Sequence, residues 1–246
     1  MAEPIGTADR SLSAQIYEHL RTAIIEGEIA PGTKMREQWL ADQLSVSRVP
    51  LREAIPLLEA EGLVYTAPRR GTFVTQLTLR DVDDLFDVRE SLETLAARLA
   101  AQRSGQPEAK ETVAALQDNL TRAKRAVQDG DDPAIAATSA EFHRLVVELS
   151  GNALLRTMMR PISGRVQWLF RLTAARDPRA ACRAHEKLLR AILRGEVERA
   201  GELAFEHIAS GRKPSLVLLA DVLPLDGRAT TSSRPSTSRA RSSVAG

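Results

Sequence analysis

Three of the four histidines of this 246-residue chain lie in its second half, at positions where their side chains could meet. His185 and His207 flank an expected helix-to-helix turn at Gly195 and Glu196. At 1.5 Å per residue they stand roughly 15 and 18 Å from that turn, so two antiparallel helices would bring them to nearly the same height. Two such imidazoles can share a metal ion if His143 supplies a third ligand from another helix. The spacing leaves open that all three are ordinary core or surface histidines.

A second group of residues whose side chains could bind a ligand is a pair of arginines near the N-terminus. Arg48 and Arg52 are four residues apart, so both guanidinium groups project from one side of an expected helix. A guanidinium can donate to O6 and N7 of guanine together, which suits base reading in DNA. The alternative is a solvated face, with local pairs to Glu53 or Glu59. The apolar stripe of the same helix consists of Leu51, Ala54, Ile55 and Leu58.

The flanking residues favour a DNA-reading unit. Helical spacing predicts helices over about 13–26 and 37–44, and Ser47 is well placed to cap a third. After Gly62 the chain reads as a strand, a turn, and a second strand, and the turn carries the sequence PRRG. Three helices and an arginine-tipped β-hairpin make a winged helix-turn-helix, which we expect over residues 11–76.

These residues resemble the DNA-binding domain of GntR-type bacterial regulators. The segments that carry the resemblance are LSAQIYEHLRTAIIEGEIAPGTKMREQWLADQLSVSRVPLREAIPLLEAEGLV and PRRGTFV, of which SRVPLREA is quite specific. The resemblance implies a recognition helix in the major groove. One departure is Pro56, whose missing N–H is expected to kink or loosen the third helix. The residues expected to contact DNA are Gln38, Ser47, Arg48, Arg52, Arg69, Arg70 and Gly71.

Beyond residue 80 the pattern is helical throughout, so the fold class is mainly α. About six helices joined by short loops predict an antiparallel all-α bundle over residues 81–212. They are expected near 81–103, 107–129, 132–150, 153–176, 178–194 and 197–212, with Pro161 and Gly164 interrupting the fourth. The expected core stripe of the first is Leu85, Val88, Leu92, Leu95 and Ala96. Residues 213–246 are expected to form a mostly disordered tail, in which 215–225 could instead be a docked final helix.

Residues 81–212 resemble the ligand-binding domain of the FadR subgroup of these regulators. The segments that carry this resemblance are LFDVRESLETLAARLA, EFHRLVVELSGNALL and HEKLLRAILRGEVERAGELAFEHI. Many members hold a divalent metal through one aspartate and three histidines, which match His143, His185 and His207. Ser139 stands at the aspartate position, which weakens any cation site, although three imidazoles can still bind zinc or a similar ion. Arg89 matches an arginine that often faces the effector cavity, where it can pair with an organic acid. Its alternative is a surface pair with Glu93.

Bulk composition excludes some classes of protein. No stretch approaches the roughly 20 apolar residues that span a bilayer, so no membrane partner is expected. Cys182 is the only cysteine, which fits a reducing cytoplasm. Residues 1–76 carry eight Lys or Arg and ten Asp or Glu, so the DNA prediction depends on where the arginines lie.

The leading hypothesis is a cytoplasmic, homodimeric transcription regulator, not an enzyme, acting as a repressor or an activator. Its two recognition helices would enter successive major grooves of a pseudopalindromic operator. A small-molecule effector, expected to be a carboxylate, would bind in the bundle and control operator affinity. One alternative is a three-histidine metalloenzyme with an incidental helical N-terminal domain, although no HExxH pair, Gly-rich phosphate loop or G-x-S-x-G elbow is found. Another is a regulator controlled only by its abundance.

Overall fold

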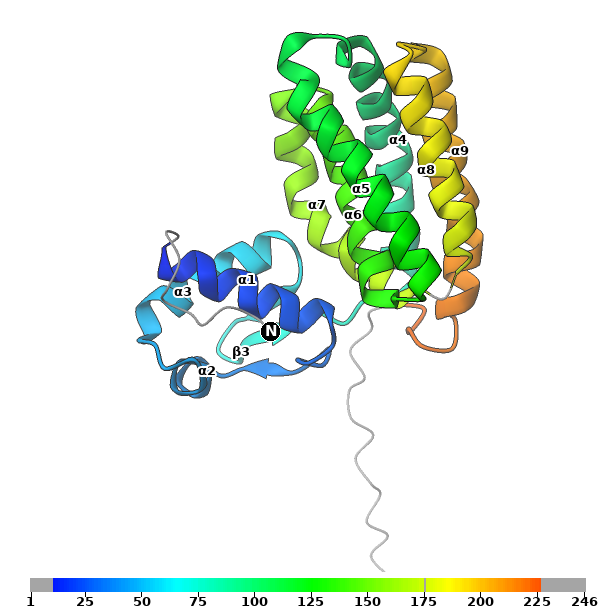
Figure 1. The fold of residues 1–246 in the computed structure, drawn as a ribbon. Helices are drawn as coiled ribbons and strands as arrows, with labels where there is room; N and C mark the ends of the chain where they lie inside the picture. Colours follow the sequence, from blue (N-terminus) through cyan, green and yellow to red (C-terminus); the bar gives the residue numbers. More distant parts are fainter. Residues whose placement is uncertain (1–10, 175, 227–246) are drawn as a thin grey trace, which may run out of the picture.

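The computed structural model describes residues 11–174 and 176–226, which fall into two parts (Figure 1). A small N-terminal part of three helices and a sheet lies at one end of a taller helical bundle (Figure 1). The predicted fold class, mainly α with a small β-hairpin, is confirmed.

The three N-terminal helices form close to their predicted bounds. They are α1 (Leu12–Ile25), α2 (Glu37–Leu44) and α3 (Arg48–Ala60). Ser11 caps α1 by accepting a hydrogen bond from the Ala14 N–H. α3 remains one helix through Pro56, because the proline lies on its exposed side and leaves the buried face intact. The shared core of the helices includes Ile16, Leu20, Leu51 and Leu58.

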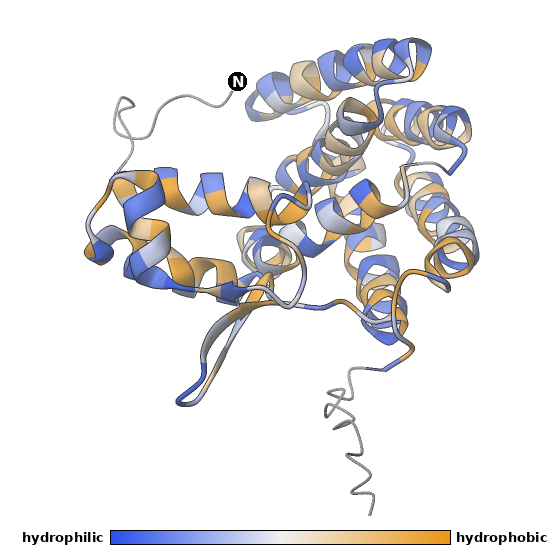
Figure 2. Ribbon diagram, turned by 90° about the horizontal axis from the view of Figure 1, so that it is seen from below, coloured by the Kyte–Doolittle hydropathy of each residue, from blue (hydrophilic) through white to orange (hydrophobic). Residues whose placement is uncertain are grey.

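The sheet contains one strand more than the sequence predicts. β2 (Val64–Ala67) and β3 (Gly71–Val74) make the expected hairpin, which extends beyond the helices as a narrow wing with a hydrophilic tip (Figure 2). β1 (Lys34–Met35) pairs with β3, so the antiparallel order is β1-β3-β2. A strand of two residues is too short to show any alternation of polar and apolar positions, so no sequence pattern revealed it.

The C-terminal part is the predicted helical bundle. Several helix starts are specified locally. Thr78 and Asp81 form a capping box on the first helix, and Asp131 and Asp177 each cap a helix that has proline in its first turn. The elements are α4 (Leu79–Arg103), a 3-10 turn (Pro107–Ala109), α5 (Lys110–Asp129), α6 (Asp132–Leu149), α7 (Ala153–Leu172), α8 (Pro178–Leu193) and α9 (Val197–Leu219).

The buried face of α4 differs from the predicted stripe. Val88 and Leu95 are 40% and 44% exposed, whereas the charged residues Arg89 and Glu93 are buried. The prediction was wrong for Val88 and Leu95 and right for Ala96, which is fully buried. An apolar stripe alone did not reveal that a pair of charged residues would face inward. In the fold, the inward face carries a buried ion pair among small and aromatic residues. The buried residues of α4 are Val82, Phe86, Arg89, Glu93, Ala96, Ala97, Ala100 and Ala101.

The predicted interruption of α7 at Pro161 and Gly164 is also wrong, because α7 runs unbroken from Ala153 to Leu172. Gly164 serves a different purpose, since a Cβ atom there would lie 2.1 Å from Oε2 of Glu61. Its missing side chain therefore allows the N-terminal part to approach α7 closely.

Residues 213–219 belong to α9 and not to the predicted tail. Leu216 and Leu219 pack against Val82 and Phe86 of α4, which explains why the helix continues through Pro214. Residues 220–226 lie beside the start of α4 in space, where the Leu79 N–H donates to the Pro224 carbonyl at 2.9 Å. The rest of the predicted tail, 227–246, lies outside the described residues.

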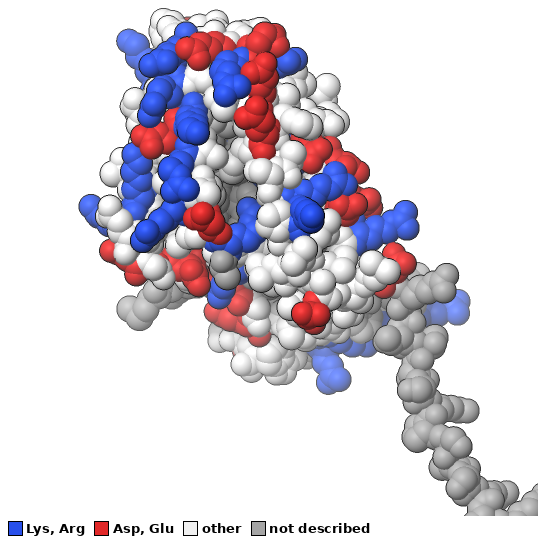
Figure 3. All heavy atoms as spheres, turned by 90° about the vertical axis from the view of Figure 1, so that its right-hand side faces the viewer, with Lys and Arg blue, Asp and Glu red and all other residues white. Residues whose placement is uncertain are grey.

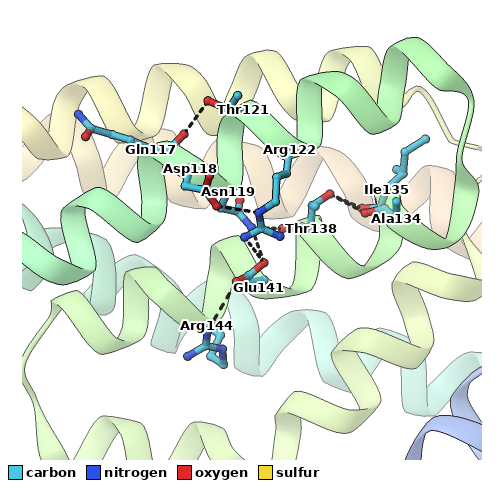
Figure 4. A network of polar contacts seen from close by, with 10 residues as sticks. All are labelled: Gln117, Asp118, Asn119, Thr121, Arg122, Ala134, Ile135, Thr138, Glu141 and Arg144. Atoms are coloured by element: carbon cyan, nitrogen blue, oxygen red, sulfur yellow. Dashed lines mark hydrogen bonds and ion pairs between the residues drawn. The ribbon is translucent and has the colours of Figure 1, made fainter. Parts of the chain in front are cut away.

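A polar network ties α5 to α6, the helix that carries His143 (Figure 4). The buried Asn119 amide donates to the Thr138 carbonyl at 3.1 Å and to Glu141 at 2.9 Å. Arg122 also donates to Glu141, at 2.8 Å. Because these bonds fix the rotation of α6, they help to set the direction in which His143 points.

Charges of both signs are interspersed on the side of the molecule that carries α8 and α9 (Figure 3). Many form local pairs, such as Arg98 with Glu198 at 2.7 Å and Arg199 with Glu202 at 2.9 Å. This side therefore does not present a surface of a single sign. Among the described residues, no helix is long and apolar enough to cross a membrane.

Candidate nucleic-acid interface and histidine pocket

The start of α3 presents the two predicted arginines to solvent. Arg48 and Arg52 are both exposed, and Arg52 Nε donates to Glu37 Oε2 of α2 at 2.6 Å. The partner is therefore neither Glu53 nor Glu59. An exposed pair of this kind contributes little free energy, so a DNA phosphate or base could replace the carboxylate. Ser47 occupies the cap position, but its side chain makes no capping hydrogen bond. Gln38 is exposed on α2 and donates to Asp42 at 2.9 Å.

The wing tip carries the second predicted pair. Arg69 and Arg70 are exposed in a tight turn closed by the Arg70 N–H and the Ala67 carbonyl at 3.0 Å. Gly71 has a φ of +99°, a region that favours glycine. A Cβ atom at Gly71 would lie 3.1 Å from Lys34 Cε, so the Lys34 side chain lies beside the tip. Sequence reasoning missed Lys34 because its strand was not recognised.

The wing is attached to α3 by side-chain bonds. Glu59 near the end of α3 accepts hydrogen bonds from the Thr66 N–H at 2.8 Å and the Thr66 hydroxyl at 3.3 Å. α3 and the wing are therefore held together, and all seven residues expected to contact DNA, including Gln38 on α2, are exposed.

In the bundle the three predicted histidines converge. His185 Nε2 lies 3.3 Å from His143 Nε2 and 3.0 Å from His207 Nε2. Two ligands of a tetrahedral zinc ion, each 2.0–2.1 Å from the metal, would lie about 3.3 Å apart. The three potential ligand atoms all lie within 4.8 Å of one another. This donor set fits a divalent ion such as zinc.

Glu93 and Arg89 form the back wall of the histidine cluster. His143 Nδ1 contacts Glu93 Oε2, which leaves Nε2 facing the other two histidines. Arg89 Nε donates to the other Glu93 oxygen at 2.7 Å, and Arg89 Nη2 lies 3.5 Å from His143 Nε2. Both charged side chains are almost fully buried, at 2% and 4% exposure. A carboxylate that orients a ligating histidine is a common outer partner of protein metal sites.

The environment holds His185 and His207 neutral and Glu93 ionised. Burial, followed by repulsion from His207, His143 and Arg89, lowers the pKa of His185 well below its usual value. Burial, followed by His143 and Arg89, lowers the pKa of His207 to about 3. Burial opposes ionisation of Glu93, but Arg89 and His143 outweigh it and hold the pKa of Glu93 below its usual range. Neutral imidazoles are the form that binds a metal.

The cluster opens into a pocket at the end of α7. Its empty volume is about 400 Å³, including the part open to solvent. Ser139 lines the pocket one turn before His143, so the position where the FadR resemblance expects an aspartate offers a hydroxyl. Arg176, which no sequence pattern indicated, also lines the pocket, whereas Arg89 lies behind His143 and does not. The predicted pair between Arg89 and Glu93 exists, but it is buried instead of exposed.

One helix, α7, touches both the pocket and the N-terminal part. The Phe170 ring lies in the pocket wall, with its centroid 5.4 Å from that of His143. On another face of α7, Gln167 accepts from Arg21 at 2.8 Å and Arg171 donates to Glu26 at 2.7 Å. Trp168 packs into the core of the N-terminal part. The two candidate sites are thus joined through a single helix.

Glu61 completes this junction from the N-terminal part. It is buried, accepts a hydrogen bond from the Tyr17 hydroxyl, and pairs with Arg21 at 3.0 Å. Its carboxylate lies against Gly164 of α7. The sequence did not suggest this contact, because the residues involved are more than 100 positions apart.

Comparison with known proteins agrees with this arrangement. Residues 12–74 match the family described as "Bacterial regulatory proteins, gntR family", and residues 84–210 match the FCD domain. The Bacillus subtilis protein named "Uncharacterized HTH-type transcriptional regulator YdhC" is 30% identical over 196 residues, covering 78% of this chain and 86% of that protein. A Paenarthrobacter nicotinovorans protein named "Probable D-xylose utilization operon transcriptional repressor" is 29% identical over 201 residues, covering 81% and 87%.

A solved structure also shares the fold. Escherichia coli McbR/YncC superposes with a TM-score of 0.71 at 24% identity, covering 86% of this chain and 99% of that one. Members of the matched family are DNA-binding transcriptional regulators and not enzymes, which contradicts the metalloenzyme alternative. They bind operator DNA through the winged helix and small-molecule effectors through the FCD domain. The chain therefore belongs to the GntR family of bacterial regulatory proteins and carries a C-terminal FCD domain, as in the FadR-like subgroup.

Proposed function

We propose that the start of α3 reads operator bases while the wing tip contacts the adjacent backbone or minor groove. The supporting observation is that exposed guanidinium groups occupy both elements, which Glu59 and Thr66 hold together. Arg48 lies in the first turn of the helix, the part that usually meets base edges. In this proposal, the Arg52 guanidinium leaves the Glu37 carboxylate and contacts the DNA when the operator binds. The remaining contacts come from Gln38, Ser47, Arg69, Arg70 and Gly71.

This proposal is tested with a duplex selected by the purified protein from a randomised pool. Replacing Arg48 or Arg52 with alanine should each cost about 1–3 kcal/mol of specific binding in a fluorescence anisotropy titration. Arg98→Ala is the matched control, because Arg98 is an exposed, ion-paired arginine of the bundle. Unchanged affinity in both α3 variants would show that this helix does not read the operator.

The protein acts as a homodimer on a pseudopalindromic site in this proposal. Val88 and Leu95 of α4 and Leu154 and Met158 of α7 are all at least 40% exposed. The surfaces of the two helices adjoin, because Val88 and Ile162 line one shared hollow. An apolar surface on adjoining helices is suited to a self-complementary contact about a two-fold axis.

The effector is a small organic acid bound in the histidine pocket. The supporting observation is an excess of cationic groups, with Arg89 and Arg176 set against the single buried carboxylate of Glu93. Arg89 contributes from behind His143, where its Nη2 faces the ligand end of the cluster. A bound carboxylate would lie within the field of this guanidinium.

His143, His185 and His207 would hold a divalent metal such as zinc, with Glu93 orienting His143. When bound, the metal would supply a Lewis-acidic point that accepts an oxygen of the effector. Ser139 contributes no anionic ligand, so we expect weaker cation binding than at a site that includes an aspartate. We place the protein in the cytoplasm, where its operator and a reduced Cys182 would both be found.

In this proposal, α7 transmits the effect of effector binding from the pocket to the DNA-binding part. A ligand at Phe170 favours one position of α7, and Gln167, Trp168 and Arg171 carry that preference to the N-terminal part. The effector changes operator affinity only if it binds the two arrangements unequally.

A further inference from the structure

Arg176 lies between α7 and α8 and reaches over to α9. Its Nη1 donates to the Gly211 carbonyl at 2.8 Å and also to the Ser215 hydroxyl. Both acceptors are neutral. The guanidinium therefore has a fixed position without having its charge compensated.

Two other arginines of the bundle that are buried or partly buried have acidic partners. Arg89 pairs with Glu93, and Arg212 pairs with Asp83 and Asp87. Within residues 11–174 and 176–226, no carboxylate forms an ion pair with Arg176. Burial and repulsion from Arg89 both lower the pKa of Arg176. A partly buried cation that lacks a counter-ion is costly, and a bound anion would remove that cost.

Part of this guanidinium is left without a described partner. Both described hydrogen bonds use Nη1, so Nε and Nη2 have no described partner. Neither nitrogen is among the fully buried polar atoms that lack a partner. Arg176 forms part of the pocket wall together with the three histidines. The Nε–Nη2 edge of arginine matches the two oxygens of a carboxylate.

The remaining wall limits the kind of anion. Ile135, Ala136, Phe170 and Ala181 supply an apolar surface within the same small pocket. Asp177 lies at the rim, but its side chain accepts from the Ala180 N–H at 2.9 Å and caps α8. A pocket with a cationic end and an apolar side suits a short acid with a carbon chain better than inorganic phosphate.

We propose that Arg176 is the anion receptor of the FCD pocket and that its Nε–Nη2 edge binds the carboxylate of a short-chain organic acid. This assignment rests on the proposed sensor function and deepens it. The carbon chain lies against Phe170 and Ile135, and the far end of the acid faces the three histidines. Arg89 holds Glu93 and His143 in place and makes no direct contact with the ligand.

The test is calorimetry on the full-length protein with butyrate, malonate and succinate, and with inorganic phosphate, each with and without added zinc. We expect at least one acid to bind and Arg176→Gln to weaken that binding at least tenfold. Arg176→Lys, which keeps the charge but not the fork, should recover part of the affinity. Arg179→Gln is the matched control, because Arg179 is exposed in the first turn of α8. It should bind as the wild type does.

A second variant keeps the arginine and disturbs only its position. A Cβ atom at Gly211 would lie 3.0 Å from Arg176 Nη1, so Gly211→Ala should weaken acid binding by less than Arg176→Gln does. Operator affinity without ligand should stay unchanged in both variants, which separates ligand recognition from misfolding.

Each contrary result overturns a different statement. Wild-type affinity for the acid in Arg176→Gln would refute the role of Arg176 and leave the sensor function standing. Failure of the wild type to bind any of the acids would refute the acid-sensing function itself. Tighter binding of phosphate than of every acid would refute the carboxylate assignment.

Discussion

At the scale of single residues, the buried pair of Arg89 and Glu93 organises the histidine pocket. Glu93 accepts from Arg89 at 2.7 Å and contacts His143 on its other oxygen. Two buried charges are tolerated here because each satisfies the other and His143 takes the remaining acceptor. The pair therefore orients a histidine, and removing one member should affect both folding and metal binding.

Glu93→Gln keeps the shape of the side chain and removes its charge. Since this leaves Arg89 buried without a counter-ion, we expect a loss of about 3–5 kcal/mol in the free energy of unfolding, measured with urea. Zinc affinity, measured by competition with a chromophoric chelator, should fall by about 10–100-fold. Glu198→Gln is the control, because Glu198 forms an exposed pair with Arg98, and it should change stability by less than about 1 kcal/mol. Unchanged unfolding and zinc binding in Glu93→Gln would contradict this role.

At the scale of elements, α7 contacts both the histidine pocket and the N-terminal part. It borders the pocket through Phe170, the N-terminal part through Gln167 and Trp168, and Glu61 through Gly164. The absence of a side chain at Gly164 allows the last of these contacts. A glycine in the middle of a helix ordinarily costs stability, so its presence has to be explained by packing.

Gly164→Ala should destabilise the protein, although the same change inside a helix ordinarily stabilises by about 1 kcal/mol. The new Cβ atom would lie 2.1 Å from Glu61 Oε2 and 3.3 Å from Leu63 Cδ1. Glu61 cannot move away without leaving Arg21 and Tyr17. We expect a net loss of about 1–3 kcal/mol in thermal or urea unfolding.

The control for this change is Gly105→Ala, because nothing lies within 4 Å of a Cβ atom at Gly105. That variant should unfold much as the wild type does. A Gly164→Ala protein as stable as the wild type, or more so, would show that α7 and Glu61 are not in tight contact.

At the scale of the whole molecule, the exposed apolar residues of α4 and α7 determine the expected assembly. Those of α4, Val88 and Leu95, are positions that the sequence pattern wrongly assigned to the core. In the proposed dimer, the exposed apolar residues of both helices lie on the side that a second copy would cover. An operator with two half-sites is bound tightly only when both DNA-binding parts are linked. Dimerisation and operator affinity should therefore be lost together.

Replacing Val88 and Leu95 together with aspartate should convert a dimer to a monomer, measured by light scattering after size exclusion. Operator affinity should fall by at least tenfold, because each half-site is then bound alone. Phe205→Asp is the control, since Phe205 is 47% exposed on α9, away from the proposed interface. A double variant that remains dimeric would place the interface elsewhere.

The amino-acid sequence by itself determined most of the local structure and was sufficient to select the candidate residues of both sites. Caps such as Asn152, Asp131 and Asp177 and the 3.6-residue period specify helix bounds within a few positions. The three histidines and the arginines of α3 and the wing could be selected because their residue types and spacing carry chemistry. These signals are local, so they can be read from consecutive residues.

Only the tertiary structure decided which faces meet. It buried Arg89 and Glu93 and exposed Val88 and Leu95, it kept α7 continuous against Glu61, and it brought Arg176 to the histidine pocket. The physical reason is that a partner 50 or more residues away leaves no trace in the periodicity of either segment. Whether a charged face turns inward depends on that partner, as Glu93 depends on His143.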